Sequence, residues 1–386
     1  MNIAKNTFIA AALSISLLSG CGNGDSREVN MLSNHALTVA EAMGLDLQSV
    51  KGSTLHVYTW SDYISPDVLE GFEKALGVTV VIDTFDSNEA MYAKLKAGGT
   101  GYDIIMPSSY QIETMAREKM IEHLDRDRLP VVINNFDPYF AAQILDPSFS
   151  FGVPYAVTYT GFAYVKDKIP ADADPASWAI LGNPALKGRI SLLDDIREVV
   201  GAGLMYLGYS VNSTNAAEID AAVEQILKWR SNVRKFDSES YKTEVASGAT
   251  WLGQGYSTDI TQVIIGDEEA GAPARNDIGF ALPKEGFAIA FDEMVLASGS
   301  KNKDLAYVFM NYMYTGDVAA ANMDYICGPM PVATGISLLD DDYRNLIVLD
   351  DNEIRNGQVL RSFDGAPEVQ ELYNRAWDRI KATEAK

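Results

Sequence analysis

Aromatic and acidic side chains are concentrated between Tyr58 and Tyr63, a stretch that also contains Trp60 and Asp62. A short apolar run before it indicates a strand, and Pro66 with helix-like sequence follows, so the stretch is expected to form a strand-to-helix loop. An aromatic face beside a fixed negative charge suits an organic ammonium ion, because the ring quadrupole and the carboxylate both attract a cation. An ordinary loop with a core Trp is an equally good explanation of this stretch alone, since aromatic residues usually serve packing.

Ser108 and Tyr110 follow another predicted strand, over 103–106, in a region where strands and helices alternate. This alternation predicts right-handed crossovers and a parallel sheet. Ligands of such sheets bind at the carboxyl ends of the strands. We therefore expect Ser108 and Tyr110 to share one rim of the sheet with Trp60 and Asp62.

The second half of the chain places an acid pair, Asp195 and Glu198, directly after a strand and at the start of a helix. Their three-residue spacing puts the two carboxylates on one helical face. Acids at a helix start also interact favourably with the helix dipole, and an internal pair with Arg197 would complete a purely structural role. The residues alone favour that structural role.

Three further side chains fit the same pattern. Tyr256 and Asp259 again place an aromatic ring and an acid after a strand, although Asp259 could simply cap the following helix. Asp292 lies within an apolar strand, where a buried carboxylate needs a partner. Asp292 is therefore the acid that a structural role explains least well.

The composition excludes several classes of protein. The chain has 386 residues, enough for about two domains, and 47% of them are hydrophobic. It carries 53 acidic and 31 basic residues, a net charge of -22, which argues against nucleic acid as a partner. The two cysteines, Cys21 and Cys327, exclude a disulfide framework and a thiolate zinc site. We expect no cofactor and no metal.

The first residues have the pattern of a secretion signal. Lys5 supplies a positive charge, and the apolar run over 8–18 is too short to span a bilayer. The sequence Leu-Ser-Gly-Cys ending at Cys21 resembles the bacterial lipobox, which implies cleavage before Cys21 and lipid attachment to it; a plain secretory signal is the alternative. We expect a signal peptide over 1–20 and a tether over 21–52.

The sequence gives little support to catalysis. None of the three histidines lies in a nucleophile–base pattern, and no serine lies in a G-x-S-x-G elbow. The acid pair Asp195 and Glu198 could suggest sugar chemistry, but its helical spacing puts the acids side by side rather than across a substrate. The chain is expected not to be an enzyme, and a sugar-binding module is a minor alternative.

Several segments in order resemble the periplasmic spermidine- and putrescine-binding proteins of ABC importers, in a lipoprotein form. The similarity runs from about Leu55 to the C-terminus. The segments that carry it are YTWSDY at 58–63, SNEAMYAKL at 87–95, YDIIMPS at 102–108, LLDDIREV at 192–199, PKEG at 283–286 and KNK at 301–303.

The resemblance implies an α/β fold of two lobes, each a mostly parallel sheet flanked by helices and joined by hinge strands, with an amine held between them. The expected N-terminal lobe comprises 53–160 and 293–336, and the C-terminal lobe comprises 161–292 and 337–386. It also implies a monomer in the periplasm or cell envelope. There it would present the polyamine to a permease, or alternatively to a membrane signalling receptor, and lipid alone would hold it to the membrane.

Ten positions match the ligand-binding residues of that family. They are Trp60 as a stacking indole, Asp62, Tyr63, Ser108, Tyr110, the pair Asp195 and Glu198, Tyr256 where the family usually has Trp, Asp259, and Asp292. The chain also departs from the family pattern, because Ala290 and Gly328 replace aromatic residues and Leu360 replaces a glutamine. The acids are thus kept better than the rings, which predicts a cationic amine site of altered shape.

Overall fold

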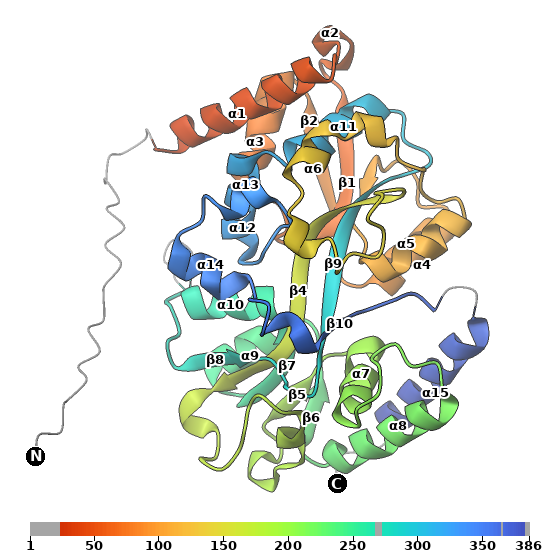
Figure 1. Ribbon diagram of the computed structural model, residues 1–386, viewed down its shortest axis with the longest axis vertical. Helices are drawn as coiled ribbons and strands as arrows, with labels where there is room; N and C mark the ends of the chain where they lie inside the picture. Colours follow the sequence, from red (N-terminus) through yellow and green to blue (C-terminus); the bar gives the residue numbers. More distant parts are fainter. Residues whose placement is uncertain (1–23, 267–271, 364–365, 383–386) are drawn as a thin grey trace, which may run out of the picture.

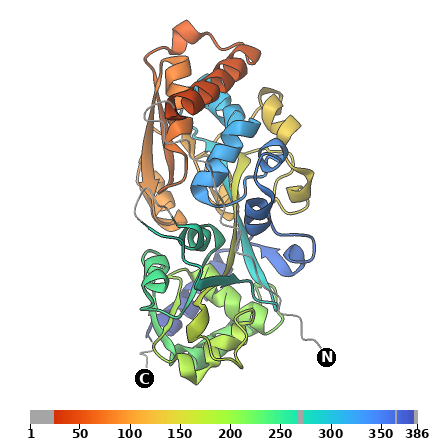
Figure 2. The ribbon, with the colours of Figure 1, turned by 90° about the vertical axis from the view of Figure 1, so that its left-hand side faces the viewer.

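Two long strands join the two halves of the molecule (Figures 1 and 2). β4 (Gly152–Val165) and β9 (Phe287–Leu296) pair antiparallel from Gly152 opposite Val295 to Tyr159 opposite Ile289. The computed structural model describes residues 24–266, 272–363 and 366–382. Within them one sheet of ten strands passes through both lobes, in the order β2-β1-β3-β9-β4-β7-β5-β6, with β10 on β9 and β8 on β4. The two-lobed α/β architecture expected from the sequence is confirmed.

The upper lobe of Figure 1 contains the parallel sheet predicted for the first third of the chain. Its strands are β1 (Thr54–Trp60), β2 (Thr79–Phe85) and β3 (Ile104–Ile105). Its main helices are α1 (Gly24–Ala42), α3 (Pro66–Leu76), α4 (Asn88–Lys96), α5 (Ser109–Arg117), α6 (Pro130–Asn135), α11 (Lys303–Tyr312), α12 (Gly316–Ile326), α13 (Ala333–Ile336) and α14 (Asp341–Ile347), with the short α2 (Leu47–Val50) before β1. Local signals explain α3, which has proline at its first position and ends at Gly77 in the left-handed conformation.

The lower lobe has its own sheet, in which β5 pairs parallel with both β6 and β7. Its strands are β5 (Ile190–Leu192), β6 (Val233–Phe236), β7 (Leu252–Tyr256) and β8 (Ile278–Ala281). Its helices are α7 (Ile196–Tyr206), α8 (Ala216–Arg230), α9 (Tyr241–Ser247), α10 (Ser257–Ile265) and α15 (Pro367–Ala382). β10 (Gly357–Val359) lies along β9 and returns the chain to this lobe.

The hydrophobic cores place the lobe boundaries differently from the sequence expectation. Phe287, Ile289 and Phe291 all belong to the upper core, so β9 contributes to the upper lobe from its first residue rather than only after 292. Ile347 also belongs to the upper core, whereas Leu360 belongs to the lower one. The last crossing therefore lies close to β10, and the boundary expected at 336/337 is wrong.

The tether expected over 21–52 is largely replaced by helix α1. Val29, Leu32, Ala36 and Val39 are buried at helical spacing and pack α1 against α3 and α11. The segment is therefore part of the upper lobe. The signal peptide and Cys21 lie outside the described residues. No helix in the described part of the chain is both long and apolar enough to cross a membrane.

Candidate ligand-binding site

Asp292 lies on hinge strand β9, and we call its carboxylate the inner acid. Its side chain is 7% exposed, and its Oδ1 accepts a hydrogen bond from the Ser108 hydroxyl at 2.6 Å. The Tyr63 hydroxyl donates to Oδ2. Burial raises the pKa of Asp292 to about 6, although both hydrogen bonds favour the ionised form. A carboxylate has about four acceptor sites, so two remain for a further donor.

Asn88 holds the residues that surround the inner acid. Its Oδ1 accepts from the Ser108 backbone N–H at 3.0 Å, and its Nδ2 donates to the Ser108 hydroxyl at 3.0 Å and to the Tyr110 hydroxyl at 2.9 Å. The first residue of α4 thus fixes the start of α5. Asn88 was not among the predicted site residues, because an Asn at a helix start is normally interpreted as a cap.

Asp195 and Glu198, which we call the outer acids, lie at the start of α7. Asp195 caps this helix, since its Oδ1 accepts from the backbone N–H groups of Arg197 at 2.7 Å and Glu198 at 3.1 Å. The structural role considered for Asp195 is therefore real, but among the described contacts both bonds go to Oδ1, which leaves Oδ2 available. Burial and the nearby Asp195 charge raise the pKa of Glu198 to about 8.

Arg197 does not form the internal pair with these acids that the sequence suggested. Its guanidinium donates to the Arg361 carbonyl and to the Asn212 side chain, both at 2.9 Å. Its central carbon lies 3.9 Å from the centre of the Phe363 ring. The hydrogen bonds of this buried cation thus tie α7 to the segment after β10.

The lobes meet at Tyr110. Its ring, from the upper lobe, lies 5.7 Å from the guanidinium carbon of Arg197 in the lower lobe. Burial and then the charges of Glu89 and Asp195 raise its pKa well above the usual value. Tyr256 lies near the same place, since burial followed by the charges of Asp195 and Glu198 raises its pKa. Four of the predicted residues, Tyr110, Asp195, Glu198 and Tyr256, therefore lie around one interlobe contact.

Asp259 has partners within its own lobe. It accepts from the Tyr241 hydroxyl at 2.5 Å and pairs with the Lys242 ammonium at 3.3 Å. The Tyr241 hydroxyl also accepts from the Tyr256 backbone N–H at 3.1 Å. Asp259 therefore helps to position Tyr256 and is less available to a ligand than Asp292.

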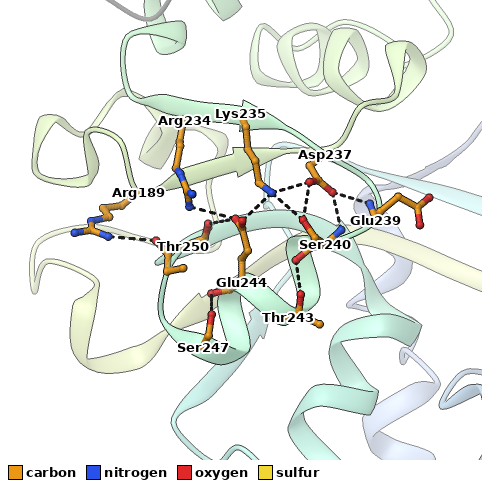
Figure 3. Close-up of polar contacts among 11 residues, drawn as sticks. Arg189, Arg234, Lys235, Asp237, Glu239, Ser240, Thr243, Glu244, Ser247 and Thr250 are labelled. Carbon is orange, nitrogen blue, oxygen red and sulfur yellow. Dashed lines mark hydrogen bonds and ion pairs between the residues drawn. The ribbon is translucent and has the colours of Figure 1, made fainter.

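A polar network anchors the helix that supplies Tyr241 and Lys242 (Figure 3). The Lys235 ammonium on β6 lies 2.6 Å from Asp237, 2.8 Å from the Ser240 hydroxyl and 2.8 Å from Glu244. Asp237 also accepts from backbone N–H groups at the start of α9. Burial opposes its ionisation, but the hydrogen bonds from Lys235, from the Ser240 hydroxyl and from these N–H groups together lower the pKa of Asp237. This network fixes the start of α9 against the sheet.

The aromatic stretch around Trp60 is not the single loop that was expected. β1 continues to Trp60, and Tyr58 within it is buried and stacks on Tyr102 with ring centres 4.5 Å apart. The Trp60 ring packs against Phe85 at 4.5 Å, and its buried Nε1 has no hydrogen-bond partner in the described part of the chain. Asp62 is exposed, with a φ of 52°. No described contact joins Trp60 or Asp62 to the inner acid.

Gly328 is one of the two positions where the resembled family has an aromatic ring, and the structure leaves little space for a side chain there. A Cβ atom built there would lie 2.3 Å from Cγ2 of Thr258 in the other lobe, so no side chain fits without movement. Ala290 pairs with Thr158 and is two residues from Asp292, on the same face of β9. The positions of Ala290 and Gly328 therefore supply no rings, and Tyr63 is the aromatic residue that contacts the inner acid among the described hydrogen bonds.

A cavity of about 480 Å³ lies on the opposite face of the hinge. Tyr159 and Phe287 line it, and each is an odd number of residues along its strand from Ala156 or Asp292, which face each other. The cavity is therefore separated from the inner acid by the hinge sheet. Within the described residues, no group of His, Cys, Asp and Glu side chains converges in a way that could hold a metal ion.

Comparison with known proteins identifies relatives that cover nearly the whole chain. Residues 67–346 match the family described as bacterial extracellular solute-binding protein. A putrescine/cadaverine-binding protein of Pseudomonas aeruginosa is 34% identical, over 89% of this chain and 98% of its own length.

Solved structures of similar proteins support the same family relationship. The spermidine/putrescine ABC transporter substrate-binding protein of Streptococcus pneumoniae has a TM-score of 0.71 and 30% identity, covering 85% of this chain and all of that one. A lipoprotein of Treponema pallidum has a TM-score of 0.74 and 29% identity, covering 85% and 99%. The resemblance found in the sequence is confirmed.

Buried carboxylates predict how the stability of the ligand-free protein depends on pH. Burial raises the pKa of Asp292 to about 6 and the pKa values of Glu198 and of Glu293, the buried acid next to Asp292 on β9, to about 8, above the values of about 4 in an unfolded chain. The folded state then binds more protons than the unfolded state between about pH 4 and 8. We expect the free energy of unfolding to fall as the pH rises from 5 to 8, measured by urea denaturation.

The variant Glu198→Gln is the control for this dependence. It removes one of the titrating groups and should flatten the decline between pH 5 and 8. A free energy of unfolding that increases with pH across this range would contradict the prediction, because it would mean that ionisation of these carboxylates does not destabilise the folded state.

Proposed function

Because this chain belongs to the family of bacterial extracellular solute-binding proteins, we propose that it captures a polyamine between its two lobes and presents it to an ABC permease. The family and the relatives named above are binding proteins rather than enzymes. The observation that carries the proposal is Asp292, a carboxylate buried on the hinge strand with neutral hydroxyl partners and spare acceptor sites.

The chemistry of the inner acid favours an ammonium ion. A buried carboxylate without a cation is costly, and so is an ammonium stripped of water, but together each replaces the water that the other loses. The Ser108 and Tyr63 hydroxyls hold both Asp292 oxygens in place before a ligand arrives. A bound ammonium needs no rearrangement of these groups, so the site is preorganised.

The outer acids Asp195 and Glu198 supply a second negative end on the other lobe. A chain of methylenes with an ammonium at each end can contact both groups. A neutral sugar can donate hydrogen bonds to them but brings no positive charge to compensate either one. The inner acid and the outer acids also repel one another while no cation is present. A polycation removes this repulsion and contacts both lobes only when they are closed, so it favours the closed arrangement over the open one. Spermidine and putrescine, the amines in the printed names of the relatives, have this architecture.

Asp292→Asn is the direct test of the proposed function. The amide keeps the shape but removes the charge, so spermidine binding should weaken at least tenfold, or about 1.4 kcal/mol, in calorimetric titration. Asp172→Asn, which neutralises an exposed aspartate of the lower lobe, is the matched control and should bind as the wild type does. Unchanged affinity in Asp292→Asn, or binding of a neutral oligosaccharide instead of the amine, would contradict the proposal.

We further propose that lipid on Cys21 anchors the protein in the cell envelope. Cys21 itself lies outside the described residues, and α1 begins only three residues later, at Gly24. Three residues span about 10 Å at most. The upper lobe would then lie close to the membrane surface. The similarity to a protein described as a lipoprotein of Treponema pallidum supports this anchor.

Replacement of the anchored residue tests the lipid proposal. Cys21→Ser should move the protein from the membrane fraction to the soluble fraction, while Cys327→Ser should leave it on the membrane. Mass spectrometry of the mature wild-type N-terminus should show an acylated Cys21. An unmodified N-terminus, or a Cys21→Ser protein that stays on the membrane, would exclude the anchor.

A further inference from the structure

We propose that Glu89, which no expectation from the sequence singled out, acts with the outer acids and contacts the second ammonium of the ligand from the upper lobe. The inference rests on the proposed function and concerns the same interlobe site. It would make the second ammonium a bridge between the lobes, because Glu89 lies on α4 whereas Asp195 and Glu198 lie on α7.

The position of Glu89 follows from its neighbour Asn88. The Asn88 amide holds the Tyr110 hydroxyl at 2.9 Å, and the Tyr110 ring lies 5.7 Å from the guanidinium carbon of Arg197. The first turn of α4 and the first turn of α7 therefore approach each other from opposite lobes, with Tyr110 between them. Each turn carries a carboxylate, Glu89 on one side and Asp195 on the other.

The electrostatics of the contact confirm that these carboxylates are neighbours. Glu89 keeps solvent-exposed surface, but protein atoms crowd around its carboxyl group and partly desolvate it. This desolvation, followed by the charge of Asp195, raises the pKa of Glu89. Glu89 in turn is the first charge that raises the pKa of Tyr110, ahead of Asp195. Like charges so placed destabilise the closed arrangement unless a cation lies between them.

Arg197, the cation near these carboxylates, already has partners within the protein. Arg197 lowers the pKa of Glu89, so it partly compensates the acids. Its hydrogen bonds, however, go to the Arg361 carbonyl and to Asn212, and its flat face lies on Phe363. Even with Glu198 protonated near neutral pH, Glu89 and Asp195 outnumber this guanidinium and leave room for one further positive charge.

The accessibility of Glu89 gives it a distinct role from the outer acids. Glu198 is 3% exposed and Asp195 caps α7, so both are fixed in the lower lobe before the ligand binds. Glu89 is exposed in the first turn of α4 on the upper lobe, so it meets an ammonium held by the outer acids only when the lobes approach. Glu89 should therefore determine how strongly a bound polyamine holds the lobes together.

Calorimetric titration with spermidine tests this inference. Glu89→Gln should weaken binding about tenfold, and Glu89→Asp, which keeps the charge, should recover most of that loss. Glu113→Gln is the matched control, because Glu113 is an exposed glutamate of the same lobe, on α5. It should change the affinity less than twofold. Equal losses in Glu89→Gln and Glu113→Gln would mean a general effect of net charge and would overturn the inference.

A double-mutant cycle with Asp195→Asn tests whether the two carboxylates share one ammonium. Shared contact predicts that the double variant loses less affinity than the product of the two single losses. A fully multiplicative loss would overturn the shared site. Wild-type protein that does not bind spermidine would refute the proposed function itself, whereas normal binding by both wild type and Glu89→Gln would refute only the role of Glu89.

Discussion

The burial of unpaired negative charge between two lobes is the constraint on which the rest of this structure depends. Within the described part of the chain, Asp292 has two hydroxyl partners and no cationic one, and Glu198 is buried beside a second carboxylate. In a protein interior such groups either take up a proton or acquire a counter-ion. The interlobe contact therefore favours the binding of positive charge. A polycation can supply that charge without any change in the fold of either lobe.

The scaffold serves to keep those charges in place. Three helices begin at the contact: α4 with Asn88, α5 with Ser108 as its cap residue, and α7 with Asp195 as its cap. Helix starts tolerate carboxylates because their free N–H groups and dipoles are positive. The same residues thus end a strand, start a helix and face the other lobe, which explains why a structural role and a binding role coexist at Asp195.

Much of the site could be predicted because its residues carry local signals. Asp292 is an acid in an apolar strand, and Asp195 and Glu198 form a spaced pair after a strand. Glu89 and Asn88 have no such signal, because their importance arises from the approach of α4 to α7, which depends on the relative placement of the two lobes. Sequence periodicity within one helix carries no information about a partner helix on another lobe.

In the fold, too, features with a local sequence signal could be predicted and features that depend on the packing of distant segments could not. Strand–helix alternation predicts the parallel sheets, whereas the lobe boundaries differ from the expected ones because β9 supplies the upper core along its length and β10 pairs with it late in the chain. Polar composition after a lipobox is typical of a tether, but Val29, Leu32, Ala36 and Val39 recur at helical spacing and are buried in α1. That spacing was a usable signal for an amphipathic helix.

Proton release on binding tests the central claim most directly. Wild-type protein is titrated with spermidine at pH 7 in two buffers of different ionisation enthalpy, and the difference in heat gives the number of protons exchanged. Because Glu198 has a pKa raised to about 8, it is largely protonated before binding, and the arriving cation should expel protons into the buffer. Binding without proton release would contradict the account, as would the absence of binding.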